Sequence, residues 1–195
     1  MNKGQETYQR VIDTAIYLFA KDGIHKTSFA MIAKELGMTK PSLYYYVESK
    51  DELIKKVFVY IFQDYAFENY FKVEDMTKDN LMEQLYTGGM KYLNEIQEQK
   101  VLLNLLSEYT LYANRIKAVD ETYIQKIKEV QKMFIDGFVH VLQKATEFGL
   151  MEENNLQAKA GVLALMLDNL LNYKMLDMQI VESAIWSQTI TDVMK

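Results

Sequence analysis

The chain contains no cysteine, and only two histidines, one proline and eight glycines occur among its 195 residues. Without cysteine it can form neither a disulfide framework nor a thiolate metal site. The two histidines, His25 and His140, are too far apart in the sequence to suggest a histidine-based metal site. Since glycine and proline are the residues that most often interrupt helices, their scarcity leaves few breaks. We therefore expect a mostly helical chain with no metal and no cofactor.

Long hydrophobic runs are also missing. The longest apolar stretch, interrupted by one glycine, is residues 160–167, well short of the ~20 residues that a membrane helix needs. The first fifteen residues lack the charged-then-apolar order of a signal peptide. Because 49% of the residues are hydrophobic, the chain can still bury a substantial core, which excludes a disordered protein. We expect a cytoplasmic protein with no membrane partner.

Charge is distributed unevenly along the chain. The net charge is −5, but residues 1–60 carry a net charge of +2 and the remaining residues carry −7. A small basic excess is weak support for nucleic-acid binding, because most charged side chains are simply solvated. The distribution permits a phosphate-binding module at the N-terminus and places the acidic part behind it.

Helical periodicity covers almost the whole sequence. A first helix should end at Gly23, and a second should begin at Thr27 or Ser28 and end at Gly37. Nothing alternates like a strand over more than a few residues, so the predicted fold class is all-α with about nine helices. The remaining helices are expected as a short one begun by Thr39 and Pro41, one from Ser49 to about Phe71, and five near 79–98, 101–114, 119–148, 155–175 and 178–194.

The second and third of these helices have the spacing of a helix-turn-helix unit. Only "GM" and a capping threonine separate them, which is too short for an antiparallel hairpin of long helices. Ala33 supplies a small side chain where the helices cross, and Gly37 can adopt positive φ in the turn. The second helix of such a unit enters the DNA major groove with its N-terminal residues first. Those residues are Thr39, Lys40, Pro41 and Ser42.

Three consecutive tyrosines, 44–46, follow this helix start. Successive residues of a helix are rotated by about 100°, so the three side chains cannot all face one core. At least one of them must be exposed or lie at an interface.

The stretch "VIDTAIYLFAKDGIHKTSFAMIAKELGMTKPSLYYYVESKDELIKKVF", residues 11–58, resembles the tetracycline-repressor (TetR) family of bacterial transcription regulators. It follows that family's order of Leu-Phe-Ala-x-x-Gly, Thr-Ser, Ile-Ala-x-x-Leu-Gly, Leu-Tyr-x-x-Val/Phe and Lys-x-x-Leu. The resemblance implies an N-terminal three-helix DNA-binding domain, residues 1–52, extending into the fourth helix. Residues 53–195 would then form a larger helical domain for ligand binding and dimerisation.

The resemblance also assigns DNA-binding roles to single residues. Tyr44 and Lys50 look like the family's phosphate anchors, Tyr45 occupies a position used for backbone or base contact, and Tyr46 replaces a frequent histidine or tyrosine. Ala30 stands where some members carry a longer polar side chain, so we expect less base readout from the second helix. The full expected set is Thr27, Ser28, Thr39, Lys40, Pro41, Ser42, Tyr44, Tyr45, Tyr46 and Lys50.

Two features of the larger domain suggest further sites. The segment 158–176 is apolar nearly all round its helix, so it must be covered on both sides, either by a second copy of the chain or as the central helix of a monomer. The expected dimer residues are Gly161, Ala164, Leu165, Asp168, Leu171 and Trp186.

Two glycines inside a predicted helix, "YTGGMKYL", indicate a kink or close packing. Aromatic residues around them fit either plain core or an apolar pocket, whose expected lining is Met90, Leu106, Tyr109, Tyr112, Phe134 and Phe138.

The sequence thus favours a homodimeric transcription regulator, most simply a repressor that a small-molecule inducer releases from a palindromic operator; activation stays open. One alternative is a helix-turn-helix adaptor that binds protein without DNA. Another is a di-iron carboxylate enzyme, which requires paired Glu-x-x-His motifs. Neither histidine has a glutamate three residues before it, so we expect no enzyme.

Overall fold

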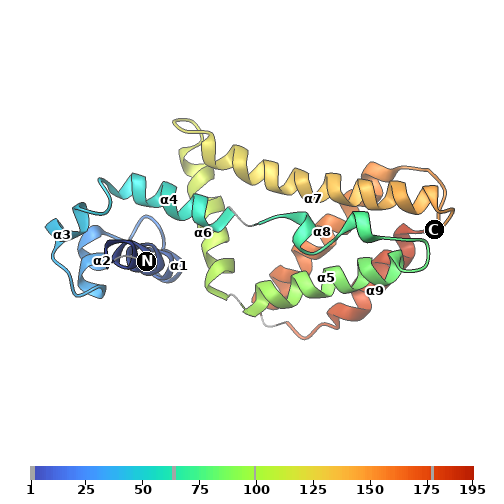
Figure 1. Cartoon of the computed structure of the whole chain (residues 1–195), viewed down its shortest axis with the longest axis horizontal. Helices are drawn as coiled ribbons and strands as arrows, with labels where there is room; N and C mark the ends of the chain where they lie inside the picture. The colour runs from blue at the N-terminus through green and yellow to red at the C-terminus, as the bar shows by residue number, and fades with distance from the viewer. Residues whose placement is uncertain (1–2, 63–64, 99, 177) are drawn as a thin grey trace. The chain divides into compact units, whose positions relative to one another are not determined.

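The computed structural model describes residues 3–62, 65–98, 100–176 and 178–195. Within them the chain forms nine α-helices, two short 3₁₀ helices and no strand, which confirms the all-α prediction (Figure 1). The fold divides into two compact units, one formed by residues 1–64 and 100–126 and the other by residues 65–99 and 127–195. The predicted boundary between residues 52 and 53 stays a prediction.

The first unit contains α1 (Lys3–Asp22), α2 (Phe29–Glu35), α3 (Lys40–Tyr44), α4 (Lys50–Phe62) and α6 (Lys100–Ile116). Helix α1 packs against α2, α4 and α6, while α2 packs against α3. Apolar side chains from each helix fill the core, because each amphipathic helix has one face to bury. Representative fully buried residues are Val11, Phe19, Ile32, Leu43, Leu53 and Leu105.

Local signals set the helix ends of this unit as predicted. Helix α1 ends at Asp22, and Gly23 follows with φ +90°; α2 ends at Glu35, and Gly37 follows with φ +65°. Both values lie in the left-handed region that glycine adopts without steric cost. At α4, the backbone N–H of Glu52 donates to the Ser49 hydroxyl, as in a capping box.

The second unit contains η1 (Phe67–Asn69), η2 (Val73–Asp75), α5 (Leu81–Glu98), α8 (Leu156–Met175) and α9 (Glu182–Val193). It also contains most of α7 (Thr122–Glu147), whose first five residues belong to the first unit. Helices α5, α8 and α9 pack against one another. Phe67, Phe71 and Phe138 form a buried aromatic core, with ring centroids 4.7–5.0 Å apart.

Close packing explains the paired glycines of α5, as predicted. A Cβ at Gly88 would lie 2.6 Å from the Tyr70 carbonyl oxygen, and one at Gly89 would overlap the indole of Trp186. These residues therefore let the Phe67–Asp75 segment and α9 approach the α5 backbone directly. Helix α5 contains both glycines without interruption.

The prediction of one helix from Ser49 to about Phe71 is wrong. Helix α4 ends at Phe62, and the backbone is extended at Ala66 before η1 begins. The buried rings of Phe67 and Phe71 are four residues apart, which mimics helical periodicity in the sequence. Their partner Phe138 comes from α7, a contact that local pattern does not reveal.

Candidate functional site

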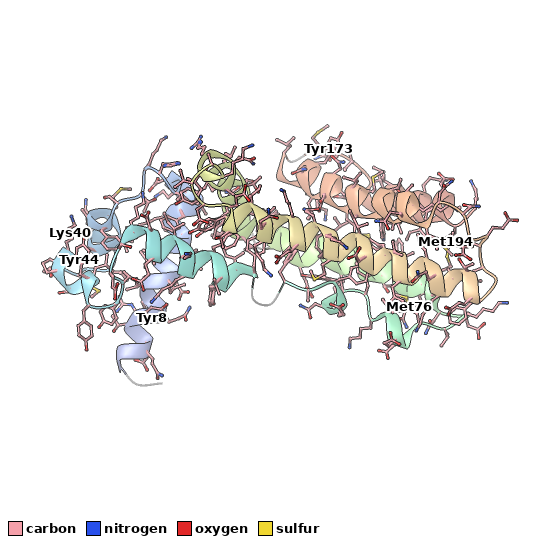
Figure 2. All side chains as sticks on the ribbon, turned by 90° about the horizontal axis from the view of Figure 1, so that it is seen from above. Tyr8, Lys40, Tyr44, Met76, Tyr173 and Met194 are labelled. Carbon is pink, nitrogen blue, oxygen red and sulfur yellow. The ribbon has the colours of Figure 1, made fainter. Side chains whose placement is uncertain are left out.

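The N-terminal end of α3 is capped and exposed. The Thr39 hydroxyl accepts a hydrogen bond from the backbone N–H of Ser42 at 3.3 Å, and the two hydroxyl oxygens lie 2.8 Å apart. Pro41 occupies the first turn, where its missing N–H leaves no bond unmade. All four residues 39–42 are exposed. Figure 2 shows Lys40 and Tyr44 on α3, whose buried Leu43 holds the helix onto the core.

The three tyrosines after this start have different surroundings. Tyr44 is half exposed and its ring contacts Phe29 edge-on, with the centroids 5.0 Å apart. Tyr45 is 85% exposed, and Tyr46 is intermediate and packs against it. The prediction that at least one tyrosine is exposed is confirmed. Tyr44 and Tyr45 together present a phenol and an aromatic face beside the front of α3.

Lys50 is the first residue of α4, and it ties this helix to the turn between α1 and α2. Its Nζ donates to the carbonyl oxygen of His25 at 3.0 Å. Partial burial lowers the pKa of Lys50. An ammonium group carries three protons, so this bond leaves two donors for another acceptor.

The two DNA contacts predicted at the start of α2 differ in their exposure to solvent. Ser28 is exposed and caps the helix, accepting a hydrogen bond from the backbone N–H of Met31. Thr27 is fully buried, and its hydroxyl lies 2.9 Å from the carbonyl oxygen of Gly23 and 3.2 Å from that of Leu18. Its hydroxyl is therefore committed to the core. The prediction that Thr27 belongs to the DNA-binding set stays a prediction, but its buried hydroxyl is not free for such a contact.

The six expected pocket residues do not share one unit. Leu106, Tyr109 and Tyr112 belong to the first unit, whereas Met90, Phe134 and Phe138 belong to the second. The prediction of one pocket lined by all six stays a prediction.

In the first unit, the Tyr109 hydroxyl donates to the carbonyl oxygen of Ile54 at 2.7 Å and is fully buried. Burial raises the pKa of this phenol well above its ordinary value. The rings of Tyr109 and Tyr112 also contact Tyr123. Both tyrosines therefore serve as core here, and the phenol of Tyr109 is occupied by a backbone acceptor.

In the second unit, Phe134 lies in a cluster that sequence reasoning missed. The hydroxyl oxygens of Tyr65 and Tyr92 lie 2.6 Å apart, and both rings contact Phe134. Burial raises the pKa of both phenols, and the negative charge of Asp168 raises it further. The available sequence signal was Asp168 itself, one carboxylate inside the apolar run "ALMLDNLL" of α8.

The expected dimer residues differ in their exposure to solvent. Leu165 is 63% exposed, and a Cβ at Gly161 would meet no atom within 4 Å, so both face open space. Ala164, Leu171 and Trp186 are buried within their own chain, and the Trp186 indole N–H donates to the Tyr86 carbonyl oxygen. These three residues support the fold and present no surface to a second copy.

Two surface hollows lie elsewhere in the structure. One of about 500 Å³ lies between α1 and α4 in the first unit, and one of about 280 Å³ lies between α5 and α9 in the second. Neither is lined by an expected pocket residue.

Among the described residues, no group of three acidic or histidine side chains is placed to hold a metal ion. None of the described helices combines the length and apolar character that crossing a bilayer requires.

Sequence comparison finds bacterial transcription regulators that are similar to this chain, which agrees with the helix-turn-helix seen in the first unit. Residues 11–57 match the family model described as bacterial regulatory proteins, tetR family. The transcriptional regulator AcrR of Shigella flexneri is 34% identical over 28% of this chain, and the match spans only 26% of that protein. The biofilm operon negative regulator IcaR of Staphylococcus epidermidis is 26% identical, with 80% of this chain and 95% of that protein covered.

The fold is also similar to solved structures over nearly its full length. SmeT, the repressor of a Stenotrophomonas maltophilia multidrug efflux pump, aligns with a TM-score of 0.68 at 15% identity, covering 98% of this chain and 90% of that one. At this identity the likeness concerns the fold alone. The family match over α1 to α4 and the sequence similarity to IcaR identify the chain as a regulator of the TetR family.

Proposed function

We propose that this regulator is a repressor that binds a palindromic operator as a homodimer and is released by a small molecule. The observation that carries the proposal is the exposed, capped front of α3, where Lys40, Pro41 and the phenols of Tyr44 and Tyr45 are accessible while Leu43 is buried. This arrangement suits insertion into a major groove, with backbone contacts at its sides. IcaR, a relative that this chain covers almost completely, is described as a negative regulator.

Residues around α3 divide into two proposed roles. Lys40, Pro41 and Ser42 meet base edges or the adjacent backbone, and Thr39 starts the helix that presents them. Tyr44, Tyr45 and Lys50 bind phosphates, with the exposed Ser28 at the start of α2 and Tyr46 nearby. Exposed lysines at positions 26 and 34 add positive charge to the same unit. Because phosphate contacts displace counterions, affinity should fall steeply as salt rises.

Gel shifts with the DNA upstream of the protein's own gene test this proposal. Lys40→Ala and Tyr44→Phe remove one charge and one hydroxyl from exposed side chains, and each should weaken binding. Lys50→Ala should do the same and reduce the salt dependence by about one counterion. Lys132→Ala is the matched control, since Lys132 is an exposed lysine of α7 in the second unit.

Undiminished binding by Lys50→Ala and Tyr44→Phe would overturn the assignment of phosphate anchors. Complete absence of salt-sensitive, sequence-dependent DNA binding by the purified wild-type dimer would instead favour the protein-binding adaptor. Because Lys50 also bonds to the His25 carbonyl, its variant needs a thermal unfolding curve beside the gel shift. Lys40 is exposed at the helix front and gives the cleaner result.

The proposed dimer rests on the outer side of α8. Val162 and Leu165 are large apolar side chains that are 47% and 63% exposed. A second copy covering them would remove apolar surface from water. Leu165→Glu should therefore shift sedimentation toward the monomer. Leu111→Glu is the control, because Leu111 is similarly exposed on α6 of the first unit; equal dissociation by both variants would contradict the proposed interface.

A further inference from the structure

Helix α6 contacts the turn between α1 and α2 at two neighbouring residues of the turn. The backbone N–H of Ile24 donates to Oε2 of Glu108 on α6 at 3.1 Å. A Cβ at Gly23 would lie 3.1 Å from the same oxygen, so the carboxylate also lies against the end of α1. Tyr112 is four residues further along α6, on the same face, and its ring contacts that of His25 with centroids 5.6 Å apart. All of these residues belong to the first unit.

The same turn holds the proposed phosphate anchor. The carbonyl oxygen of His25 accepts a hydrogen bond from Lys50 Nζ at 3.0 Å, and His25 directly follows Ile24. A free lysine side chain samples many rotamers, so fixing it on a phosphate costs conformational entropy. Because the carbonyl already restrains the ammonium group in the protein alone, less of that entropy is lost when DNA binds. The position of Lys50 Nζ therefore depends on the position of the turn.

Glu108 supplies a hydrogen-bond acceptor that this turn needs. Ile24 is only 1% exposed, so water cannot easily replace a missing partner of its N–H. The Thr27 hydroxyl restrains the turn from the other side, at 2.9 Å from the Gly23 carbonyl oxygen. That bond joins the turn to the end of α1, whereas the Glu108 bond joins it to α6. Without the carboxylate, the segment that contains the His25 carbonyl would lose its link to α6.

A direct contact between Glu108 and DNA is unfavourable. Its carboxylate is negative and would be repelled by phosphates. The side chain is also half-buried, and its Oε2 already accepts the Ile24 N–H. Any effect of Glu108 on operator affinity must therefore act through the groups that it holds in place. Among these groups, the turn leads to Lys50, whose positive charge suits a phosphate.

We propose that Glu108 is a positioning residue for Lys50: it fixes the α1–α2 turn, and the His25 carbonyl of that turn holds the Lys50 ammonium ready for a phosphate. This role rests on the operator binding proposed above and on Lys50 as a phosphate anchor. It makes operator affinity depend on a residue of α6 that does not contact DNA. Since Glu108 acts through Lys50, removing its carboxylate can weaken binding no more than removing Lys50 does.

Glu108→Ala and Glu108→Gln separate the hydrogen bond from the charge. Both remove the negative charge, but the glutamine amide oxygen can still accept the Ile24 N–H. In gel shifts below the melting temperature, Glu108→Ala should bind the operator roughly threefold to tenfold more weakly than Glu108→Gln. Equal affinities would overturn the proposal. Glu121→Ala and Glu121→Gln are the matched controls at an exposed carboxylate of the same unit, and they should bind alike.

A double-mutant cycle tests whether Glu108 acts through Lys50. Glu108→Ala should have no further effect on affinity in the Lys50→Ala background, and its full effect in the Lys40→Ala background. The dependence of affinity on salt gives a second result. Both Lys50→Ala and Glu108→Ala should reduce the slope by up to about one counterion, and the double variant no further. Additive losses in the Lys50→Ala background, or an unchanged slope for Glu108→Ala, would overturn the positioning role.

Hydrogen exchange measures the contact in the full-length protein without DNA. The Ile24 amide should exchange roughly tenfold faster in Glu108→Ala than in the wild type or Glu108→Gln; equal rates would overturn the proposal. A merely structural Glu108 would lower the melting temperature and weaken binding equally in every background. If the wild type did not bind the operator, the proposed repressor would be refuted together with this role. Binding by the wild type with additive losses would refute only the positioning role.

Discussion

The tyrosines at the front of the helix-turn-helix and those in the aromatic cluster of the second unit occupy opposite environments. In the first unit, Tyr44 and Tyr45 are 48% and 85% exposed at the front of the helix-turn-helix. In the second unit, Tyr92 is 2% exposed and its hydroxyl bonds to that of Tyr65. Burial raises the pKa of both of these phenols, so they stay neutral at physiological pH. Exposed phenols next to a helix start are available to a macromolecular partner, whereas enclosed phenols that bond to each other belong to the core.

The largest expected effect comes from disrupting the second unit alone. Gly89→Ala places a Cβ in the space of the Trp186 indole, and neither the α5 backbone nor the buried ring can yield easily. Overpacking of this kind should lower the free energy of unfolding by roughly 3 kcal/mol. Trp186 is the chain's only tryptophan, so its fluorescence in a urea titration reports this unit directly.

Gly161→Ala is the control for that experiment. Nothing lies within 4 Å of a Cβ at this position on α8, and alanine is the better helix former. Its free energy of unfolding should be unchanged or raised by about 0.5–1 kcal/mol. If both glycine variants lost stability equally, helix context rather than the contact with Trp186 would account for the first result.

Sequence reasoning succeeded where the determinants are local. Ser28 and Thr39 are capping residues, and Gly23 and Gly37 adopt positive φ, all as the residue types indicated. Each of these features depends on one side chain and the next few backbone groups. For the same reason the exposed front of α3 could be anticipated before any tertiary contact was known.

It failed where distant segments decide the outcome. The early end of α4 depends on where Phe67 and Phe71 meet Phe138 of α7. Contacts between residues tens of positions apart follow from packing of the whole unit, and periodicity contains no information about them.

The next effect distinguishes a structural threonine from a DNA contact. Thr27→Val keeps the shape of this buried side chain but removes the hydroxyl that bonds to the turn after α1. We expect the free energy of unfolding to fall by about 1–2 kcal/mol, as for other buried hydrogen bonds. Operator affinity, measured on the folded protein at low temperature, should be retained. Lost affinity with unchanged stability would restore Thr27 as a phosphate contact.

A smaller effect concerns Asp168 and pH. Its pKa is raised in the folded state, so the native protein binds this proton more tightly than the unfolded chain does. The wild type should therefore gain stability relative to Asp168→Asn as the pH falls from neutrality toward the ordinary aspartate value. The neighbouring groups, the Tyr65 and Tyr92 phenols and the Gln131 amide, do not change charge in this range.

The free energy of unfolding of the wild type relative to Asp168→Asn should therefore be larger at pH 4 than at pH 7. Urea titrations of both proteins at several pH values measure it. Asp136→Asn supplies the baseline for an exposed carboxylate. A stability difference that does not vary with pH would show that the Asp168 carboxylate is as well solvated in the fold as in the unfolded chain.

The smallest effect on stability should come from the exposed tyrosine of the first unit. Tyr45→Ala removes a ring that is 85% exposed and contacts only the ring of Tyr46 among the described aromatic pairs. The free energy of unfolding should change by no more than about 0.5 kcal/mol, while operator affinity falls, since the side chain is available only to a partner. A thermal unfolding curve and a gel shift on the same preparation measure the two quantities. If stability fell and DNA binding did not, Tyr45 would resemble enclosed tyrosines such as Tyr92 and Tyr109, and side-chain exposure would no longer separate a binding surface from a core.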